Sequence, residues 1–173
     1  MKTLNDHLSQ YAAYHRDRRN IATHFIGIPM IVLAVVVLLA RPSFDVAGLV
    51  LSPATLATVA ATLYYLRLDL RFGFAMAVFL GICLAVAQAT ADLSTSAWAT
   101  VGIGLFVVGW VIQFVGHIFE GRKPAFVDDI MGLVIGPLFV VAELAFLLGM
   151  RREVEAVVVA RAGPVHVGGE VLK

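Results

Sequence analysis

The feature that most constrains this chain is a series of apolar runs, each about as long as a lipid bilayer is thick. A transmembrane helix needs about 20 mostly apolar residues. Five segments reach this length, at about residues 21–40, 46–66, 72–91, 97–119 and 130–149. Only 14% of the residues are charged, whereas a soluble domain carries about a quarter. The sequence therefore predicts an integral membrane protein and excludes a water-soluble fold.

The polar N-terminal segment predicts one further helix. Apolar side chains recur at helical spacing from Leu4 to Tyr14, and we expect residues 3–17 to form a helix that lies in the membrane interface. The predicted fold class is all-α, a polytopic membrane helical bundle of about four to five transmembrane helices preceded by this interfacial helix. We expect residues 1–150 to form a single membrane-embedded domain and residues 151–173 to form a weakly ordered C-terminal tail.

The distribution of positive charge predicts the orientation. If the first four segments all span, most basic residues fall on one side, namely Lys2, Arg16, Arg18, Arg19, Arg67, Arg71, Arg122 and Lys123. Cytoplasmic loops carry an excess of Lys and Arg, so this side is predicted to be cytoplasmic. A full fifth span would place Arg151 and Arg152 outside, which the rule disfavours. Either the fifth segment re-enters the membrane or an earlier segment does not cross it.

This orientation places three histidines at one membrane depth. His15 and His24 flank the cytoplasmic start of the first apolar run, and His117 lies at the cytoplasmic end of the fourth. Neutral imidazoles with nearby carboxylates suit a borderline divalent ion such as Fe(II), Zn(II) or Mn(II). The only cysteine, Cys83, excludes a thiolate cluster. The three histidines are therefore candidate metal ligands, although head-group contacts for His15 and structural hydrogen bonds for the other two are equally open at this point.

Polar residues near these histidines are candidate catalytic residues. Asn20 lies four residues before His24, and Gln113 and Glu120 lie on the helical face of His117. Polar groups that face lipid are costly, so such faces normally point into the bundle. A metal-bound histidine also needs an acceptor for its second ring nitrogen. Asn20, Gln113 and Glu120 are open to that role.

Two carboxylates complete the set of candidates drawn from the sequence alone. Asp128 opens the fifth segment on the cytoplasmic side and is a further candidate acceptor for an imidazole. Glu143 lies deep within that segment. An isolated carboxylate there is expensive, so Glu143 needs a partner or a proton.

Two stretches of the sequence resemble a known family. The first contains Tyr14-His15-Arg16, Asn20, His24, Gly27 and Pro29. The second begins at Trp110 and contains Gln113-Phe114-Val115-Gly116-His117, Phe119-Glu120, Arg122, Pro124-Ala125, Asp128, Gly136-Pro137 and Glu143. Together they resemble the 2-hydroxy fatty acid dioxygenase family, over about residues 4–150.

The resemblance implies a membrane-embedded, Fe(II)-dependent dioxygenase. In this α-oxidation, a 2-hydroxy fatty acid and O2 give CO2 and a fatty acid that is one carbon shorter. His15, His24 and His117 map to the iron ligands, and Glu120, Asp128 and Glu143 are candidates to complete the metal shell. We expect Arg122 or Lys123 to anchor the substrate carboxylate.

The implied partners are the 2-hydroxy fatty acid, O2 and membrane lipid. The expected location is the inner membrane of a bacterium or the endoplasmic reticulum of a eukaryote, with the active site on the cytoplasmic side. A net charge of +1 without a basic, aromatic-rich patch argues against nucleic acid. The oligomeric state is left open.

Two alternative functions also fit the sequence. Two histidines near the same ends of two helices could serve as the axial ligands of a haem in a membrane electron carrier. The chain could instead be a non-enzymatic membrane scaffold or small transporter.

Overall fold

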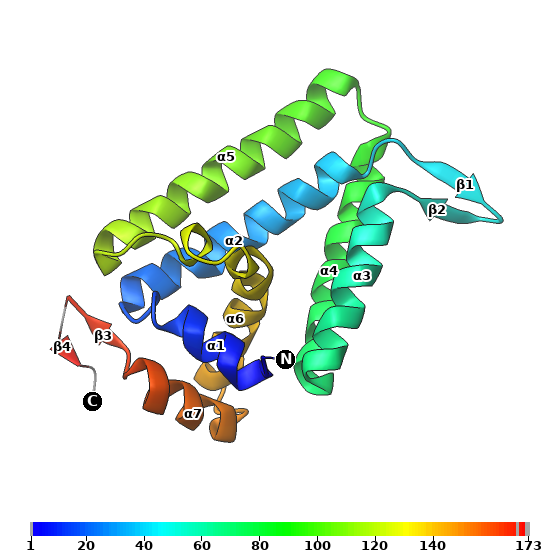
Figure 1. The fold of residues 1–173 in the computed structure, drawn as a ribbon. Coiled ribbons are helices and arrows are strands. Elements are labelled where there is room, and N and C mark those ends of the chain that lie inside the picture. The colour runs from blue at the N-terminus through cyan, green and yellow to red at the C-terminus, as the bar shows by residue number, and fades with distance from the viewer. Residues whose placement is uncertain (1, 169, 172–173) are drawn as a thin grey trace. The chain divides into compact units, whose positions relative to one another are not determined.

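The computed structural model describes residues 2–168 and 170–171 and confirms the all-α class (Figure 1). The helices are α1 (Leu4–Ala12), α2 (Arg18–Leu39), α3 (Pro53–Leu68), α4 (Leu70–Ala91), α5 (Thr95–Glu120), α6 (Met131–Leu147) and α7 (Arg152–Ala162), and a short 3-10 helix, η1 (Ala125–Val127), precedes α6. Two small antiparallel hairpins complete the fold, β1 (Phe44–Val46) with β2 (Leu49–Leu51) and β3 (His166–Val167) with β4 (Glu170–Val171).

The chain divides into two compact units. The first unit contains Met1–Ile28 and Val111–Lys173, and the second unit contains Pro29–Trp110. Helices α2 and α5 each belong partly to both. The described part of 151–173 belongs to the first unit.

Within the described residues, three helices are long and apolar enough to cross a membrane, namely α2, α4 and α5. The count becomes four if α6 and α7, which are bent by 114° at their junction, form one span. These spans and the N-terminal helix agree with the predicted membrane bundle. Helix α1 ends at Ala12 rather than near residue 17, because the chain turns there to bring His15 and Arg16 into the interior.

The second predicted segment, 46–66, is not one of these candidate spans. Its first part forms the β1–β2 hairpin, where Ala47 and Gly48 adopt positive φ angles, as tight hairpin turns require. The helix then begins at Pro53, because the Ser52 side chain accepts from the N–H of Thr55 and proline favours the first helical position. The resulting α3 has 16 residues. This shortfall favours the alternative in which an earlier segment does not cross.

Within the C-terminal tail, residues 152–162 form the helix α7. Helix α7 packs against α1 and buries Val154 and Val158, which lie one turn apart on one face. Glu153 and Glu155 in its first turn and Arg161 in its last turn suit the helix dipole. Two valines are too short a stripe to stand out in the sequence.

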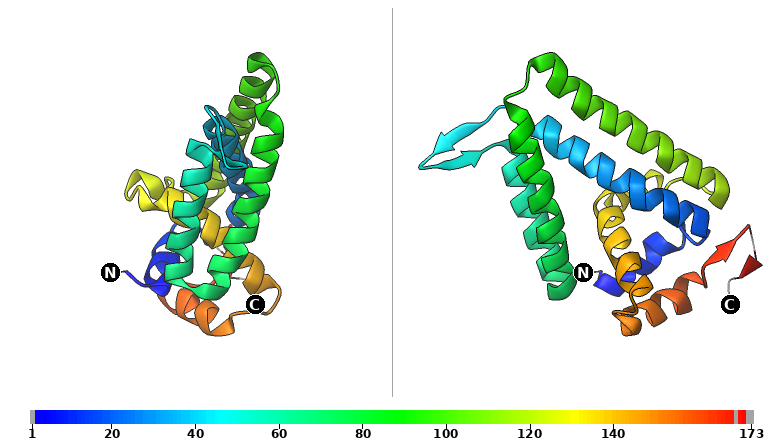
Figure 2. Two further views of the ribbon diagram at one scale, coloured as in Figure 1. Left: turned by 90° about the vertical axis from the view of Figure 1, so that its right-hand side faces the viewer. Right: turned by 180° about the vertical axis from the view of Figure 1, so that it is seen from behind.

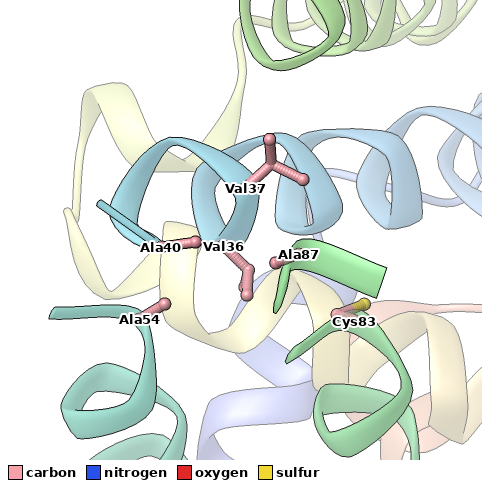
Figure 3. Packing of buried hydrophobic residues seen from close by; sticks show 6 residues of the cluster. All are labelled: Val36, Val37, Ala40, Ala54, Cys83 and Ala87. Atoms are coloured by element: carbon pink, nitrogen blue, oxygen red, sulfur yellow. The ribbon is translucent and has the colours of Figure 1, made fainter. Parts of the chain in front are cut away.

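The second unit has an apolar core built from small side chains. Helices α3 and α4 lie side by side as an antiparallel pair (Figure 2). The core cluster shown in Figure 3 contains Val36, Val37, Ala40, Ala54, Cys83 and Ala87. Trp98 packs against it and donates its indole N–H to the Val37 carbonyl at 2.8 Å. Cys83 is therefore a packing residue here.

Candidate metal centre

The structure brings His15, His24 and His117 together within the first unit. Their ring centroids lie 4.5 Å apart for His15 and His24, 5.0 Å for His15 and His117, and 5.2 Å for His24 and His117. One ring nitrogen from each lies within 4.8 Å of the other two. All three side chains are buried. This triad is the only group of three or more His, Cys, Asp or Glu residues with such spacing in the part of the chain that the structure describes.

Three different elements supply the triad. His15 lies in the turn between α1 and α2, His24 in the second turn of α2, and His117 in the last turn of α5. The ring of Tyr11 stacks on His15, with centroids 4.1 Å apart and planes 7° apart. Phe139 of α6 lies 5.6 Å from His15 and 5.0 Å from Tyr11. Aromatic rings therefore cover the side of the triad where His15 lies.

Backbone carbonyls fix two of the imidazoles. The Nδ1 of His15 lies 2.7 Å from the Tyr11 carbonyl oxygen, and the Nδ1 of His24 lies 2.9 Å from the Asn20 carbonyl oxygen. A carbonyl only accepts, so each Nδ1 carries the hydrogen and each Nε2 carries a lone pair. The acceptors are thus main-chain groups, whereas the sequence pointed to side chains.

Two ring nitrogens of the triad lack a hydrogen-bond partner among the described residues. They are the Nε2 of His15 and the Nδ1 of His117, and both are buried. Burial, reinforced by the neighbouring His24 and His117, lowers the pKa of His15 well below its usual range. A neutral imidazole is the form that binds a metal ion. Buried lone pairs of this kind fit a divalent cation, and the donor set suits Fe(II), Zn(II) or Mn(II).

Glu120 holds the turn that carries His15. Its carboxylate accepts from the backbone N–H groups of Arg16 and Asp17, both at 2.9 Å, and from the Asn20 side-chain amide at 3.0 Å. The end of α5 is thereby tied to the turn and to the start of α2. Glu120 therefore joins the two helices, and it is not part of the group of three histidines whose spacing could hold a metal ion.

Asp128 and Glu143 also have other partners. Asp128 accepts from the Tyr14 hydroxyl at 2.8 Å and from the Lys123 ammonium at 2.6 Å. Glu143 forms a buried ion pair with the Arg16 guanidinium at 2.9 Å, which supplies the partner that its position demanded. Neither belongs to the metal-spaced group among the described residues.

The remaining candidates lie around the triad or near its turn. Gln113 is buried, and its amide nitrogen has no hydrogen-bond partner within the described ranges. The Asn20 side-chain oxygen is likewise unpartnered there, although its amide nitrogen bonds Glu120. Arg122 is exposed and donates to the Ala13 carbonyl at 2.7 Å.

Sequence reasoning missed several groups that shape the centre. It gave the Arg16 side chain no role at the centre, yet Arg16 is 5% exposed and its guanidinium bonds the carbonyls of Ala12 and His15. It gave no role to the ring of Tyr11, which stacks on His15. Their positions depend on how the turn folds back. The four-residue spacing of Tyr11 and His15 was the available signal.

Gly116 permits the close approach of α5 to α2. A Cβ atom at this position would lie 2.1 Å from the Thr23 hydroxyl oxygen and 2.5 Å from the Asn20 side-chain oxygen. Small residues commonly allow such contacts between membrane helices. Since Gly116 directly precedes His117, this contact sets the position of the third imidazole.

A pocket lies beside the centre, between α1, η1 and α6. Tyr11, Tyr14, Asp128, Gly132 and Ile135 contribute to its lining. Tyr11 therefore faces the pocket and also stacks on His15. The pocket and the triad share this one aromatic ring.

Comparison with known proteins decides the family. The family model described as "2-hydroxy-palmitic acid dioxygenase Mpo1-like" matches residues 1–148. The chain belongs to the Mpo1-like family. This Mpo1-like chain is also 31% identical over 156 residues to the 2-hydroxy-palmitic acid dioxygenase MPO1 of Saccharomyces cerevisiae, covering 88% of this chain and 86% of that protein. No solved structure matches it. The resemblance seen in the two histidine-bearing stretches is confirmed.

The Gly116 contact generates a stability prediction. Gly116→Ala should lower the free energy of unfolding by about 1–3 kcal/mol, because the added methyl overpacks the interface of α5 with α2. The measurement is thermal or denaturant unfolding of the detergent-purified protein. Gly104→Ala is the matched control, because a Cβ there meets nothing within 4 Å. Equal stability of the two variants would contradict the close-contact interpretation.

Proposed function

We propose that this chain is an Fe(II)-dependent dioxygenase that performs α-oxidation of a 2-hydroxy fatty acid. The overall reaction consumes one 2-hydroxy acid and one O2 and releases the acid one carbon shorter, CO2 and water. The bond between the carboxyl carbon and the hydroxyl-bearing carbon breaks, and O2 is the oxidant. The carrying observation is the buried triad with unpartnered nitrogens in a member of the Mpo1-like family.

His15, His24 and His117 would hold the iron through ring nitrogens that lie within 4.8 Å of one another. When bound, Fe(II) would supply open coordination positions where O2 can be activated, while the 2-hydroxy acid supplies the electrons that reduce O2. The carbonyls of Tyr11 and Asn20 keep the rings of His15 and His24 in the tautomer that binds a cation. Burial of the three rings keeps bulk water away from the reacting atoms.

Arg122 is favoured over Lys123 as the anchor for the substrate carboxylate. The Lys123 ammonium already pairs with Asp128 at 2.6 Å. The Arg122 guanidinium uses one N–H on the Ala13 carbonyl, and a guanidinium has five N–H donors. Ala13 lies two residues before His15, so this contact brings Arg122 near the turn that carries a proposed ligand.

The surroundings of the triad suit an amphiphilic substrate. Ile118, Val127 and Ile130 expose 75%, 56% and 75% of their surface near the loop after α5. Apolar side chains at this position can contact an acyl chain dissolved in the membrane. The distribution of basic residues supports a cytoplasmic site, in a bacterial inner membrane or in the endoplasmic reticulum, depending on the host.

The triad geometry disfavours the haem alternative. A bis-histidine haem needs its macrocycle between two axial imidazoles. The three rings lie 4.5–5.2 Å apart by centroid, and the third ring adjoins both members of every pair. No gap for a porphyrin separates them.

Substitution of the histidines tests whether the triad binds the catalytic iron. Purified wild-type protein should contain one iron per chain and convert 2-hydroxypalmitate to the acid one carbon shorter only in the presence of O2. His24→Ala and His117→Ala should each lose the iron and this activity, because each removes one of three ligands. Elemental analysis and product detection by mass spectrometry are the measurements. Iron retained at full stoichiometry in both variants would refute the triad as the metal site.

Substitution of Arg122 tests substrate anchoring. Arg122→Gln should raise KM for 2-hydroxypalmitate about tenfold or more, because a hydrogen bond to a charged group contributes about 1.5–3 kcal/mol. Glutamine retains an N–H donor for the Ala13 carbonyl while the charge is lost. Lys123→Gln is the control and should leave KM nearly unchanged. An unaltered KM in Arg122→Gln would place the anchor elsewhere.

A further inference from the structure

The C-terminal segment lies beyond the stretch that the family model matches, which ends at residue 148. We infer that residues 152–168, here called the C-terminal strap, form a positioning element of the metal centre by fixing the turn that carries His15. The inference rests on the proposed function, since it assigns the strap a role at the proposed metal site. All of the contacts involved lie within the first unit.

The strap binds the backbone of the turn directly. The His166 N–H donates to the Arg16 carbonyl at 2.9 Å, and Asp17 forms a parallel bridge with His166. The Arg16 guanidinium donates in the other direction, to the Gly163 carbonyl at 3.4 Å. The residue next to His15 is thus held by the strap through both its main chain and its side chain.

A second contact fixes the following residue. The Gly168 N–H donates to the Asp17 carboxylate at 3.0 Å. Asp17 is fully buried and also accepts from the Arg19 backbone and guanidinium. The strap therefore completes the hydrogen bonding of a buried carboxylate two residues from a proposed ligand.

Helix α7 fastens the strap at its other end. Val154 and Val158 are buried on a helix that packs against α1. Arg161 forms an ion pair with Asp6 of α1 at 2.7 Å. The strap is therefore anchored before it reaches the turn.

Arg16 passes this restraint to His15. Its Nε donates to the His15 carbonyl at 2.9 Å and to the Ala12 carbonyl at 3.1 Å, and its terminal nitrogen pairs with Glu143. Loss of the strap removes two of the hydrogen bonds that hold Arg16. Groups that orient metal-binding histidines typically change metal affinity about 10-fold to 100-fold when they are removed.

A single backbone hydrogen bond provides the sharpest test. His166→Pro removes the N–H that reaches Arg16, whereas the matched control His166→Ala keeps it. Co(II), added to the metal-free protein in detergent, reports both the affinity and the ligand geometry through its visible absorption. We expect His166→Ala to bind as the wild type does. We expect His166→Pro to bind about 10-fold to 100-fold more weakly, with an altered spectrum.

Truncation provides a second variant that retains the packing of α7. A chain that ends at Ala162 keeps α7 on α1 but loses the contacts with Arg16 and Asp17, and a chain that ends at Val171 keeps them. The shorter chain should show the weakened Co(II) binding of His166→Pro, with circular dichroism and elution volume like those of the longer one.

The outcomes separate the two proposals. Suppose that His166→Pro and the chain that ends at Ala162 both bind Co(II) as the wild type does, while His24→Ala does not. The positioning role of the strap is then refuted, and the metal site at the triad is supported. If the wild-type protein takes up neither Co(II) nor iron, the proposed function fails, and the strap inference fails with it.

Discussion

Three imidazoles packed together in a buried site leave polar ring nitrogens without water, and the surrounding residues of the first unit hold the rings in this arrangement. Two of the ring nitrogens, on His15 and His117, lack a partner among the described residues. An unsatisfied polar atom in such surroundings costs on the order of 1–3 kcal/mol. The close contact of the rings also makes protonation unfavourable, because neighbouring imidazolium cations would repel each other. A shared divalent cation would satisfy these lone pairs at once, so the arrangement is suited to serve as a preformed ligand set.

The turn between α1 and α2 is where this ligand set is held. Glu120 collects its backbone N–H groups, and Arg16 joins it to Glu143 of α6. A buried ion pair of this kind contributes little net stability, because desolvation offsets the attraction between the charges. Its geometric effect is larger, since the guanidinium also bonds the carbonyls of Ala12 and His15. The polar network therefore fixes position more than it stabilises the fold.

The sequence predicted the convergence of the three histidines better than it predicted the contacts that hold them in place. Apolar runs and basic residues placed His15, His24 and His117 at one depth, and convergence followed from compact packing. The same reasoning predicted a full transmembrane span over residues 46–66, although Ser52-Pro53 is a typical start of a helix and would have shortened it. It could not assign Glu120, because a carboxylate that binds the backbone of a distant turn leaves no periodic pattern. It also missed α7, whose apolar face consists of two valines.

Charge balance links the ligand set to the class of substrate. Three neutral imidazole ligands would leave the positive charge of a bound divalent ion uncompensated, and a buried site would screen that charge weakly. Ion pairs with Arg16 and Lys123 neutralise Glu143 and Asp128. Glu120 keeps its charge, because its partners are neutral N–H groups, so a divalent ion would still leave the site with a net positive charge. Such a centre would attract an anion. A 2-hydroxy acid would bring its carboxylate to this charge, and its hydroxyl would give a second point of attachment. Binding at two points would select the carbon–carbon bond to be broken.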